Sequence, residues 1–259
     1  MKPSTAPGEC SSLADLTRAS DYGARILEFL PSISEAPDAE AAVCLFKRAL
    51  QLIGADAGVF QSVIRDDAMR TTYRSVLACD PLWAVEYVKH GWHDCDPWLR
   101  HALRSEEPTL GTALDVRPDE EAFVTTSASL GFASAVVAPA PSCAGTSRVG
   151  VLTLGSHNVG FFEDEGYRLV RVIAKALAME LHRWLLQAIR KELLTLSRIT
   201  AAELDLLRHE EAGHTSKMIG AALHIEPKTV DCRFQRLSAK LEAPDRRTAA
   251  RIARLYGLL

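Results

Sequence analysis

The chain has 259 residues, enough for one large domain or two modest ones, and we expect two. No apolar run reaches the roughly 20 residues that a membrane-spanning helix needs, and the chain does not begin with a basic segment followed by an apolar run. The six cysteines show neither a C-x-x-C pair nor a regular framework, which favours a reducing, cytoplasmic compartment. The net charge of −3 is unevenly divided: residues 195–259 hold 11 basic and 8 acidic side chains, whereas the residues before them hold 19 and 25. The basic excess thus lies at the C-terminal end, where contacts with nucleic-acid phosphates would need it.

Residues 1–20 are rich in Pro, Gly and Ser and are expected to form a loose leader without structure. Residues 21–187 predict a first domain. Its expected helices cover residues 39–52, the stretches after Pro81 and Pro97, residues 119–130 and a long closing helix at residues 162–186. Extended runs at residues 58–65, 72–78, 134–138 and 149–154 are expected to form a sheet, the last two as an antiparallel pair. The pattern predicts an α/β/α sandwich with a central antiparallel sheet and an apolar ligand pocket between the sheet and one helical layer.

One cluster of aromatic and acidic residues is informative in this domain. Trp83 and Tyr87 are four residues apart and would share a helix face, and Asp96 stands before Pro97 at the expected start of the next helix. Around an apolar cavity, the carboxylate could accept an amide N–H and the indole could donate to a neighbouring carbonyl. Two plainer interpretations stay open: Trp83 and Tyr87 as core aromatics, and Asp96 as a helix cap. We expect no metal site at residues 93–96, because four adjacent residues cannot all face one ion.

Residues 188–199 are expected to be a linker, and residues 200–259 predict an all-α domain of four short helices. Gly213 can take the left-handed conformation that ends a helix, and Thr215 or Ser216 can cap the next. Pro227 suits the first turn of a third helix. Helices joined by such a short turn form a helix-turn-helix, whose second helix enters the major groove of double-stranded DNA. The third helix carries the candidate DNA-binding residues, which otherwise form an ordinary solvated face: Lys228, Thr229, Asp231, Arg233, Gln235, Arg236 and Lys240.

This C-terminal segment resembles the DNA-binding domain of the LuxR-type quorum-sensing transcriptional regulators. The resemblance is carried by Glu203, Leu207, Gly213, Thr215, Ile219, Leu223, Ile225, Thr229, Val230, Lys240, Leu241, Gly257 and Leu258. Departures from the family's pattern are found at His209, Glu211, His214, Gly220 and Arg233. The resemblance implies that Asp231, Arg233 and Gln235 read bases. The remaining candidates would then lie nearer the phosphates.

The first domain resembles the same family through the W-x-x-x-Y and D-P pattern of Trp83, Tyr87 and Asp96. This implies an N-acyl homoserine lactone ligand, with Trp83 donating to the lactone carbonyl and Asp96 accepting the amide N–H. Tyr87 would line the acyl pocket, and Thr153 would reach the acyl carbonyl. Where the family has a tyrosine, a tryptophan and a glycine, this chain has Cys79, Gly111 and Ala135. Loss of the two rings could widen the pocket, whereas the methyl group of Ala135 could narrow it.

We therefore expect a ligand-responsive transcriptional regulator, with no cofactor and no catalytic activity, that binds a palindromic DNA site as a homodimer. The face of the last helix, residues 245–256, that is expected to pair the two copies carries Ala249, Ile252, Ala253 and Tyr256. An alternative is an anti-activator that blocks a homologous regulator without binding DNA, because Glu210, Glu211 and Asp231 oppose phosphate contact. No nucleophile motif, phosphate loop or metal-ligand spacing supports an enzyme.

Overall fold

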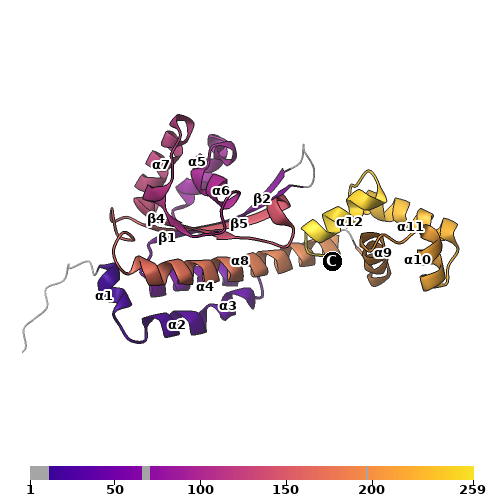
Figure 1. Cartoon of the computed structure of the whole chain (residues 1–259), viewed down its shortest axis with the longest axis horizontal. Coiled ribbons are helices and arrows are strands. Elements are labelled where there is room, and N and C mark those ends of the chain that lie inside the picture. The colour runs from indigo at the N-terminus through magenta and orange to yellow at the C-terminus, as the bar shows by residue number, and fades with distance from the viewer. Residues whose placement is uncertain (1–11, 66–70, 197) are drawn as a thin grey trace, which may run out of the picture. The chain divides into compact units, whose positions relative to one another are not determined.

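The computed structural model describes residues 12–65, 71–196 and 198–259, which fall into two compact units. The first unit comprises the described parts of residues 1–62, 74–141 and 149–182, and the second comprises those of residues 63–73, 142–148 and 183–259. A sheet covered by helices and a separate group of four helices together confirm the predicted α+β fold class (Figure 1). Within the described ranges, no helix combines the length and apolar character needed to cross a membrane.

A five-stranded sheet forms the centre of the first domain, in the order β2-β1-β5-β4-β3. Its strands are β1 (Ala57–Arg65), β2 (Thr71–Ala78), β3 (Thr109–Leu110), β4 (Ser134–Ala140) and β5 (Arg148–Ser156). β4 pairs antiparallel with both β3 and β5, which confirms the predicted pair. Every residue of β4 and β5 is buried, as expected for apolar strands covered on both faces. The sequence did not predict β3, because two residues are too few for a periodic pattern.

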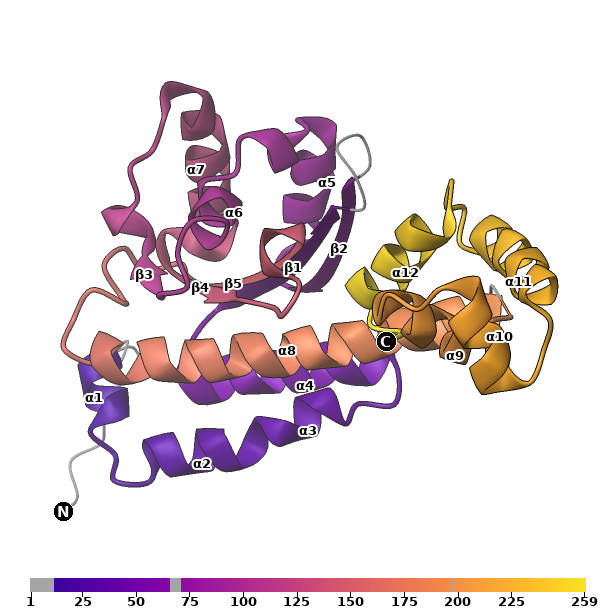
Figure 2. The same cartoon turned by 45° about the vertical axis from the view of Figure 1, so that its right-hand side comes forward.

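Helices cover both faces of the sheet, which gives the predicted α/β/α sandwich (Figures 1 and 2). One layer contains α4 (Ala39–Ile53) and α8 (Tyr167–Leu196), with α2 (Tyr22–Phe29) and α3 (Pro31–Ser34) packed on α4. The other layer contains α5 (Pro81–Lys89), α6 (Pro97–Ala102) and α7 (Glu121–Ser127). The predicted helix at residues 119–130 is thus divided. A 3-10 turn (Pro118–Glu120) precedes α7, and a π-helical turn (Ala128–Phe132) follows it, where Gly131 has a φ of +105°.

Two glycines of β5 show which strand residues face which layer. A Cβ atom on Gly155 would lie 2.4 Å from the ring of Phe132, which follows α7, whereas one on Gly150 would lie 3.0 Å from His182 of α8. Successive residues of a strand point to opposite faces, so Thr153 shares the face of Gly155. Ala135 pairs with Gly155 and shares it too. Both therefore face the layer of α5, α6 and α7.

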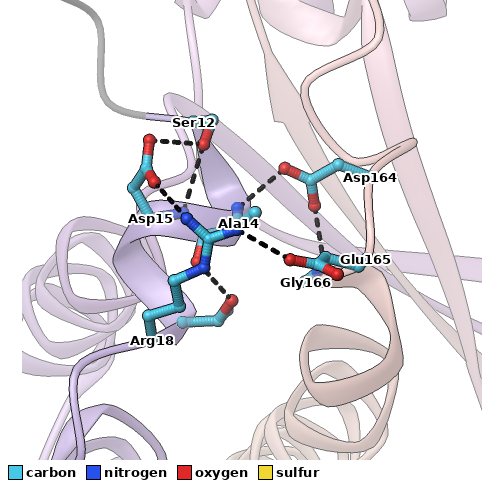
Figure 3. Close-up of polar contacts among 8 residues, drawn as sticks. Ser12, Ala14, Asp15, Arg18, Asp164, Glu165 and Gly166 are labelled. Atoms are coloured by element: carbon cyan, nitrogen blue, oxygen red, sulfur yellow. Dashed lines mark hydrogen bonds and ion pairs between the residues drawn. The ribbon is translucent and has the colours of Figure 1, made fainter.

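The first helix, α1 (Leu13–Thr17), lies inside the segment that we expected to be an unstructured leader. That expectation is wrong for these residues, while residues 1–11 lie outside the described ranges. Asp164 accepts hydrogen bonds from the backbone N–H groups of Ala14 at 2.7 Å and Gly166 at 2.8 Å (Figure 3). Arg18 pairs with Glu165 at 2.9 Å (Figure 3). The contacts that hold α1 come from the segment before α8, about 150 residues away, so no local pattern predicts them.

The closing helix of the first domain differs from its predicted bounds. α8 begins at Tyr167 and continues to Leu196, so it includes most of the residues that we expected to form a linker. Its stripe of buried apolar residues continues to Ile189, beyond the predicted end of the helix.

Four short helices make up the C-terminal domain, as predicted: α9 (Ala201–Glu211), α10 (Ser216–Leu223), α11 (Pro227–Lys240) and α12 (Arg246–Leu255). The predicted breaks are present. Gly213 has a φ of +76°, and the Thr215 hydroxyl accepts a hydrogen bond from the backbone N–H of Met218. One core joins α9, α10 and α11. Its fully buried residues include Leu207 of α9, Ile219 of α10, and Val230 and Leu237 of α11.

Candidate functional site

Six aromatic rings gather on the face of the sheet that α5, α6 and α7 cover. They are Trp83, Tyr87, Trp92, Trp98, Phe123 and Phe132, all at most 8% exposed. The centroid of the Trp83 ring lies 4.8 Å from that of Tyr87 and 6.2 Å from that of Trp98, to which it is parallel within 3°. Phe123 meets Trp98 edge-on at 4.7 Å. Each such pair adds about 0.5–1.5 kcal/mol to the stability gained from burial alone. The sequence predicted Trp83 and Tyr87, whereas the other four join them through the packing of separate helices.

The polar side-chain atoms of Trp83 and Tyr87, and those of the neighbouring Asp96, have partners inside the protein. Nε1 of Trp83 donates to Oγ of Ser127, the last residue of α7, at 3.1 Å. The Tyr87 hydroxyl donates to Oδ2 of Asp96 at 3.0 Å. Oδ1 of Asp96 accepts the backbone N–H groups of Trp98 at 2.8 Å and Leu99 at 3.1 Å, which caps α6. The two interpretations left open by the sequence are therefore both correct descriptions of the structure: Trp83 and Tyr87 are core aromatics, and Asp96 is a cap.

The carboxylate of Asp96 lies in an unusual environment. Its side chain is buried, and burial raises the pKa of Asp96 to about 6, although the hydrogen bonds from Leu99, Tyr87 and Trp98 act in the opposite direction. A carboxyl group in this position accepts hydrogen bonds strongly and has little water to compete for them.

The three positions where this chain departs from the family's pocket divide into two places. Gly111 and Ala135 are neighbours, since a Cβ atom on Gly111 would lie 3.2 Å from that of Ala135. A ring at residue 111 and a methyl group at residue 135 would compete for the same space, so the two changes are coupled rather than independent. Cys79 lies elsewhere, in a cavity of about 360 Å³ that Leu50, Asp56, Leu130 and His157 also line. Burial raises the pKa of the Cys79 thiol to about 12, so it is protonated at neutral pH.

An ion pair between the partly exposed Arg100 and the buried Glu120, not predicted from the sequence, connects the helices of this site. Arg100 of α6 donates to both carboxylate oxygens of Glu120, at 2.6 and 2.7 Å, and to the carbonyl oxygen of Asp115. Glu120 is only 1% exposed and also accepts the backbone N–H of Arg117 at 3.0 Å. The pair ties α6, which Asp96 caps, to the turn before α7, which carries Ser127.

The candidate DNA-binding residues lie on the outer face of α11. The inner stripe of this helix is Val230, Phe234, Leu237 and Ser238, all buried. The spacing of these residues places the opposite face toward solvent, and all seven candidates are exposed: Lys228, Thr229, Asp231, Arg233, Gln235, Arg236 and Lys240. Their contacts within the domain divide them into two groups.

Two of the seven candidates have partners within the domain. Nζ of Lys240 lies 2.7 Å from Oε1 of Glu203 on α9, and Oδ1 of Asp231 accepts a hydrogen bond of 2.6 Å from Ser216 of α10. Among the described residues, no ion pair involves Lys228, Arg233 or Arg236. Of the cationic candidates, these three therefore have no ion pair with any residue that the structure describes.

Arg246 of α12 connects the four helices of the domain. Its Nε atom lies 2.8 Å from Oε2 of Glu210 on α9, an ion pair with an angle outside the hydrogen-bond range. Its Nη1 atom donates to Ser216 of α10 at 2.9 Å, and its guanidinium lies 5.3 Å from the ring centroid of Phe234 on α11. The sequence did not indicate this role.

The expected self-pairing face of α12 is wrong in part. Ala249 and Ala253 are 0% exposed and Ile252 is 7% exposed, and the two alanines belong to the core that α9 also forms. Tyr256 is only partly exposed. The amphipathic pattern correctly identified a buried face, but the domain's own core covers it.

Two departures from the family's pattern contact each other. Nδ1 of His209, near the end of α9, lies 2.8 Å from Nδ1 of His214, in the turn before α10. One ring must donate and the other accept, so at least one of them is neutral in this contact. Within the described ranges, no group of three or more His, Cys, Asp and Glu side chains is placed to hold a metal ion.

Comparisons with known proteins match both domains. Residues 38–185 match the family model described as the autoinducer binding domain, and residues 197–253 match that of bacterial regulatory proteins of the luxR family. No curated protein sequence matches the chain.

Solved structures match the fold of the chain. The crystal structure of Escherichia coli SdiA has a TM-score of 0.70 at 17% identity and covers 92% of this chain and 99% of its own. The structure of SdiA in complex with octanoyl-rac-glycerol has a TM-score of 0.68 at 16% identity, and the match covers 93% of this chain and 98% of that structure's chain. CepR2 from Burkholderia cenocepacia, an N-acylhomoserine lactone dependent LuxR family transcription factor, gives 0.54 at 24% identity, with coverages of 63% and 96%.

Proposed function

The chain belongs to the LuxR family of bacterial regulatory proteins, and we propose that it responds to a small amide ligand, an N-acyl homoserine lactone or a close relative. An autoinducer-binding domain joined to a LuxR-type helix-turn-helix makes it a quorum-sensing transcription regulator. This family consists of regulators and not of enzymes. The proposal adds the ligand class, the residues that hold it and the DNA-bound dimer.

The observation that carries the ligand proposal is the placement of Trp83 and Asp96 on either side of Tyr87. The Trp83 and Tyr87 rings are 4.8 Å apart, and the Tyr87 hydroxyl bonds Asp96 at 3.0 Å. This buried site thus offers the indole donor of Trp83 and the carboxylate acceptor of Asp96, with the buried Thr153 on β5. An acylated lactone presents a carbonyl, an amide N–H and a second carbonyl, which these three groups can pair in turn.

Calorimetric titration of the full chain with lactones of increasing acyl length tests this proposal. We expect one site per chain, with affinity lost in both Asp96→Asn and Trp83→Phe. The first change replaces one acceptor oxygen of the carboxylate with an NH2 donor, the second removes the indole N–H, and both keep most of the volume. Trp92→Phe is the matched control: it changes another buried ring of the cluster and is expected to keep the affinity. Equal binding by all four proteins, or none by the wild type, contradicts the proposal.

We also propose that two copies place their α11 helices in successive major grooves of a palindromic site. The exposed Lys228, Arg233 and Arg236 supply phosphate and guanine contacts, Thr229 supplies a phosphate contact and Gln235 suits adenine. Gel shifts with and without lactone test this, since no retardation under either condition excludes it. Because Ala249 and Ala253 are buried in the core, the dimer contact is proposed to involve other surfaces.

The acidic residues that motivated the anti-activator alternative have partners in the domain. Glu210 pairs with Arg246 at 2.8 Å, and Glu211 pairs with Arg254 at 2.9 Å. Asp231 accepts from Ser216 and lies 3.8 Å from Arg246. Their charge is therefore partly neutralised before DNA approaches, which weakens the main argument against phosphate contact.

A further inference from the structure

Trp83 and Ser127 form a buried hydrogen bond between two helices of the site. Both residues are 1% exposed, and Nε1 of Trp83 lies 3.1 Å from Oγ of Ser127. Ser127 ends α7, directly before the π-helical turn that contains Gly131.

The two polar groups proposed to hold the ligand differ in how many partners they can take. An indole has one N–H and can serve one acceptor well, so Trp83 cannot bond both Ser127 and a ligand carbonyl. A carboxylate has about four acceptor positions, and Asp96 uses three of them for Tyr87, Trp98 and Leu99. Asp96 can therefore add the amide N–H of a ligand, whereas Trp83 must exchange one acceptor for another.

We propose that Ser127 is an internal competitor for the ligand: its hydroxyl holds the Trp83 indole in the unliganded domain and so sets the ligand concentration at which the regulator responds. This inference rests on the proposed function. In the unliganded domain, the bond spares Trp83 the cost of an unpaired buried N–H. On binding, the ligand carbonyl replaces the serine oxygen, so the net gain is only the difference between two hydrogen bonds. The serine hydroxyl can rotate toward another acceptor after the exchange.

Ser127→Ala separates this inference from a purely structural role, because the two predict opposite effects on binding. In the unliganded variant the Trp83 N–H has lost its acceptor. In the liganded variant it is paired with the ligand carbonyl. We expect a lower unfolding midpoint for the unliganded protein and a dissociation constant for the lactone about 3- to 10-fold smaller. Ser129→Ala is the control, because the Ser129 hydroxyl is exposed and donates to the Thr126 carbonyl at 2.7 Å. It should change neither quantity.

A ligand that lacks the contested carbonyl provides the second control. An N-acyl cyclopentylamine keeps the amide and the ring but has no lactone carbonyl, so Ser127→Ala should not tighten its binding. The double-mutant cycle of Ser127→Ala with Trp83→Phe measures the same bond in unfolding experiments. If Ser127→Ala does not fold, Ser127→Cys, whose sulfur is only a weak acceptor, takes its place in the binding experiment and in the cycle.

The outcomes separate the two proposals. Lactone binding that weakens or stays unchanged in Ser127→Ala, or a cycle in which the effects of the two substitutions on unfolding are additive, overturns the role of Ser127 while the proposed function stands. Absence of lactone binding by the wild type and by Ser127→Ala overturns both. Tighter lactone binding with unchanged binding of the cyclopentylamine supports the inference.

Discussion

The two domains use polar side chains in opposite ways. In the first, the polar groups of Trp83 and Asp96 are buried among aromatic rings and are paired inside the protein: Trp83 with Ser127, and Asp96 with Tyr87 and two backbone N–H groups. In the second, the polar contacts lie in partly exposed ion pairs, such as that of Arg246, whose side chain is 31% exposed. A buried contact costs much to break and is specific, whereas an exposed one is weakened by water and salt. The first arrangement suits the recognition of one small molecule, and the second leaves cations available for a polyanion.

The largest effect should come from breaking the ion pair between Arg100 and Glu120 in the first domain. Arg100→Ala leaves the carboxylate of Glu120, which is 1% exposed, without its cation. We expect the free energy of unfolding in urea to fall by about 3–5 kcal/mol. Arg171→Ala is the matched control, because its pair with Glu107 is long, at 3.4 Å, and both side chains are exposed. It should cost less than about 1 kcal/mol. Similar losses in the two variants would contradict the contrast drawn between buried and exposed contacts.

The second prediction concerns the pH dependence of stability that Asp96 causes. The pKa of Asp96 is about 6 in the folded protein and close to its usual 3.8 in the unfolded chain, so the folded state holds the proton more tightly between these values. Its contribution therefore favours the fold below pH 4 and is lost as the pH rises through 6. Asp96→Asn does not titrate. The unfolding free energy of the asparagine variant minus that of the wild type should therefore rise by up to ~3 kcal/mol between pH 4 and 6. Above that range it should stay level. A difference that does not change with pH would exclude a perturbed Asp96.

How far the sequence predicts these contacts depends on the distance along the chain. The Thr215 cap, the place of Pro227 in the first turn of α11 and the shared face of Trp83 and Tyr87 were predicted, because each depends on residues within four positions of one another. Ser127 was missed, because its partner is 44 residues away and a serine on a helix has no distinctive pattern. The amphipathic face of α12 was found, but its partner was assigned wrongly. A hydrophobic pattern shows that a face is buried and not what covers it.

A smaller effect is expected in the second domain from loss of the residue that links its helices. Arg246→Ala leaves Glu210, whose side chain is 6% exposed, without a cation and removes the contact with Phe234. We expect the backbone amides of α9 to α12 to exchange hydrogen faster in the full chain. The increase should correspond to a fall of about 1–3 kcal/mol in the free energy of opening. Arg254→Ala is the control: it removes the ion pair between Arg254, whose side chain is 52% exposed, and Glu211, whose side chain is 37% exposed. It should change the free energy of opening by less than about 1 kcal/mol. Equal changes would show that burial does not decide the value of ion pairs in this domain.

The smallest effect on stability, and the one most specific to function, should come from the exposed cations of α11. Arg236→Ala removes a charge for which no ion pair is found among the described residues, so unfolding should change by less than about 0.5 kcal/mol. If Arg236 contacts a phosphate, binding to the palindromic site weakens and the slope of log K against log salt becomes shallower by about 0.9 per chain. Lys240→Ala gives the opposite pattern, because its ammonium bonds Glu203 at 2.7 Å: stability falls and the salt slope stays nearly unchanged. Two cations of the same helix, Arg236 and Lys240, are thus distinguished by whether an acidic side chain of the domain pairs with them. A change of the salt slope in Lys240→Ala as large as that in Arg236→Ala would show that the ion pair opens on DNA.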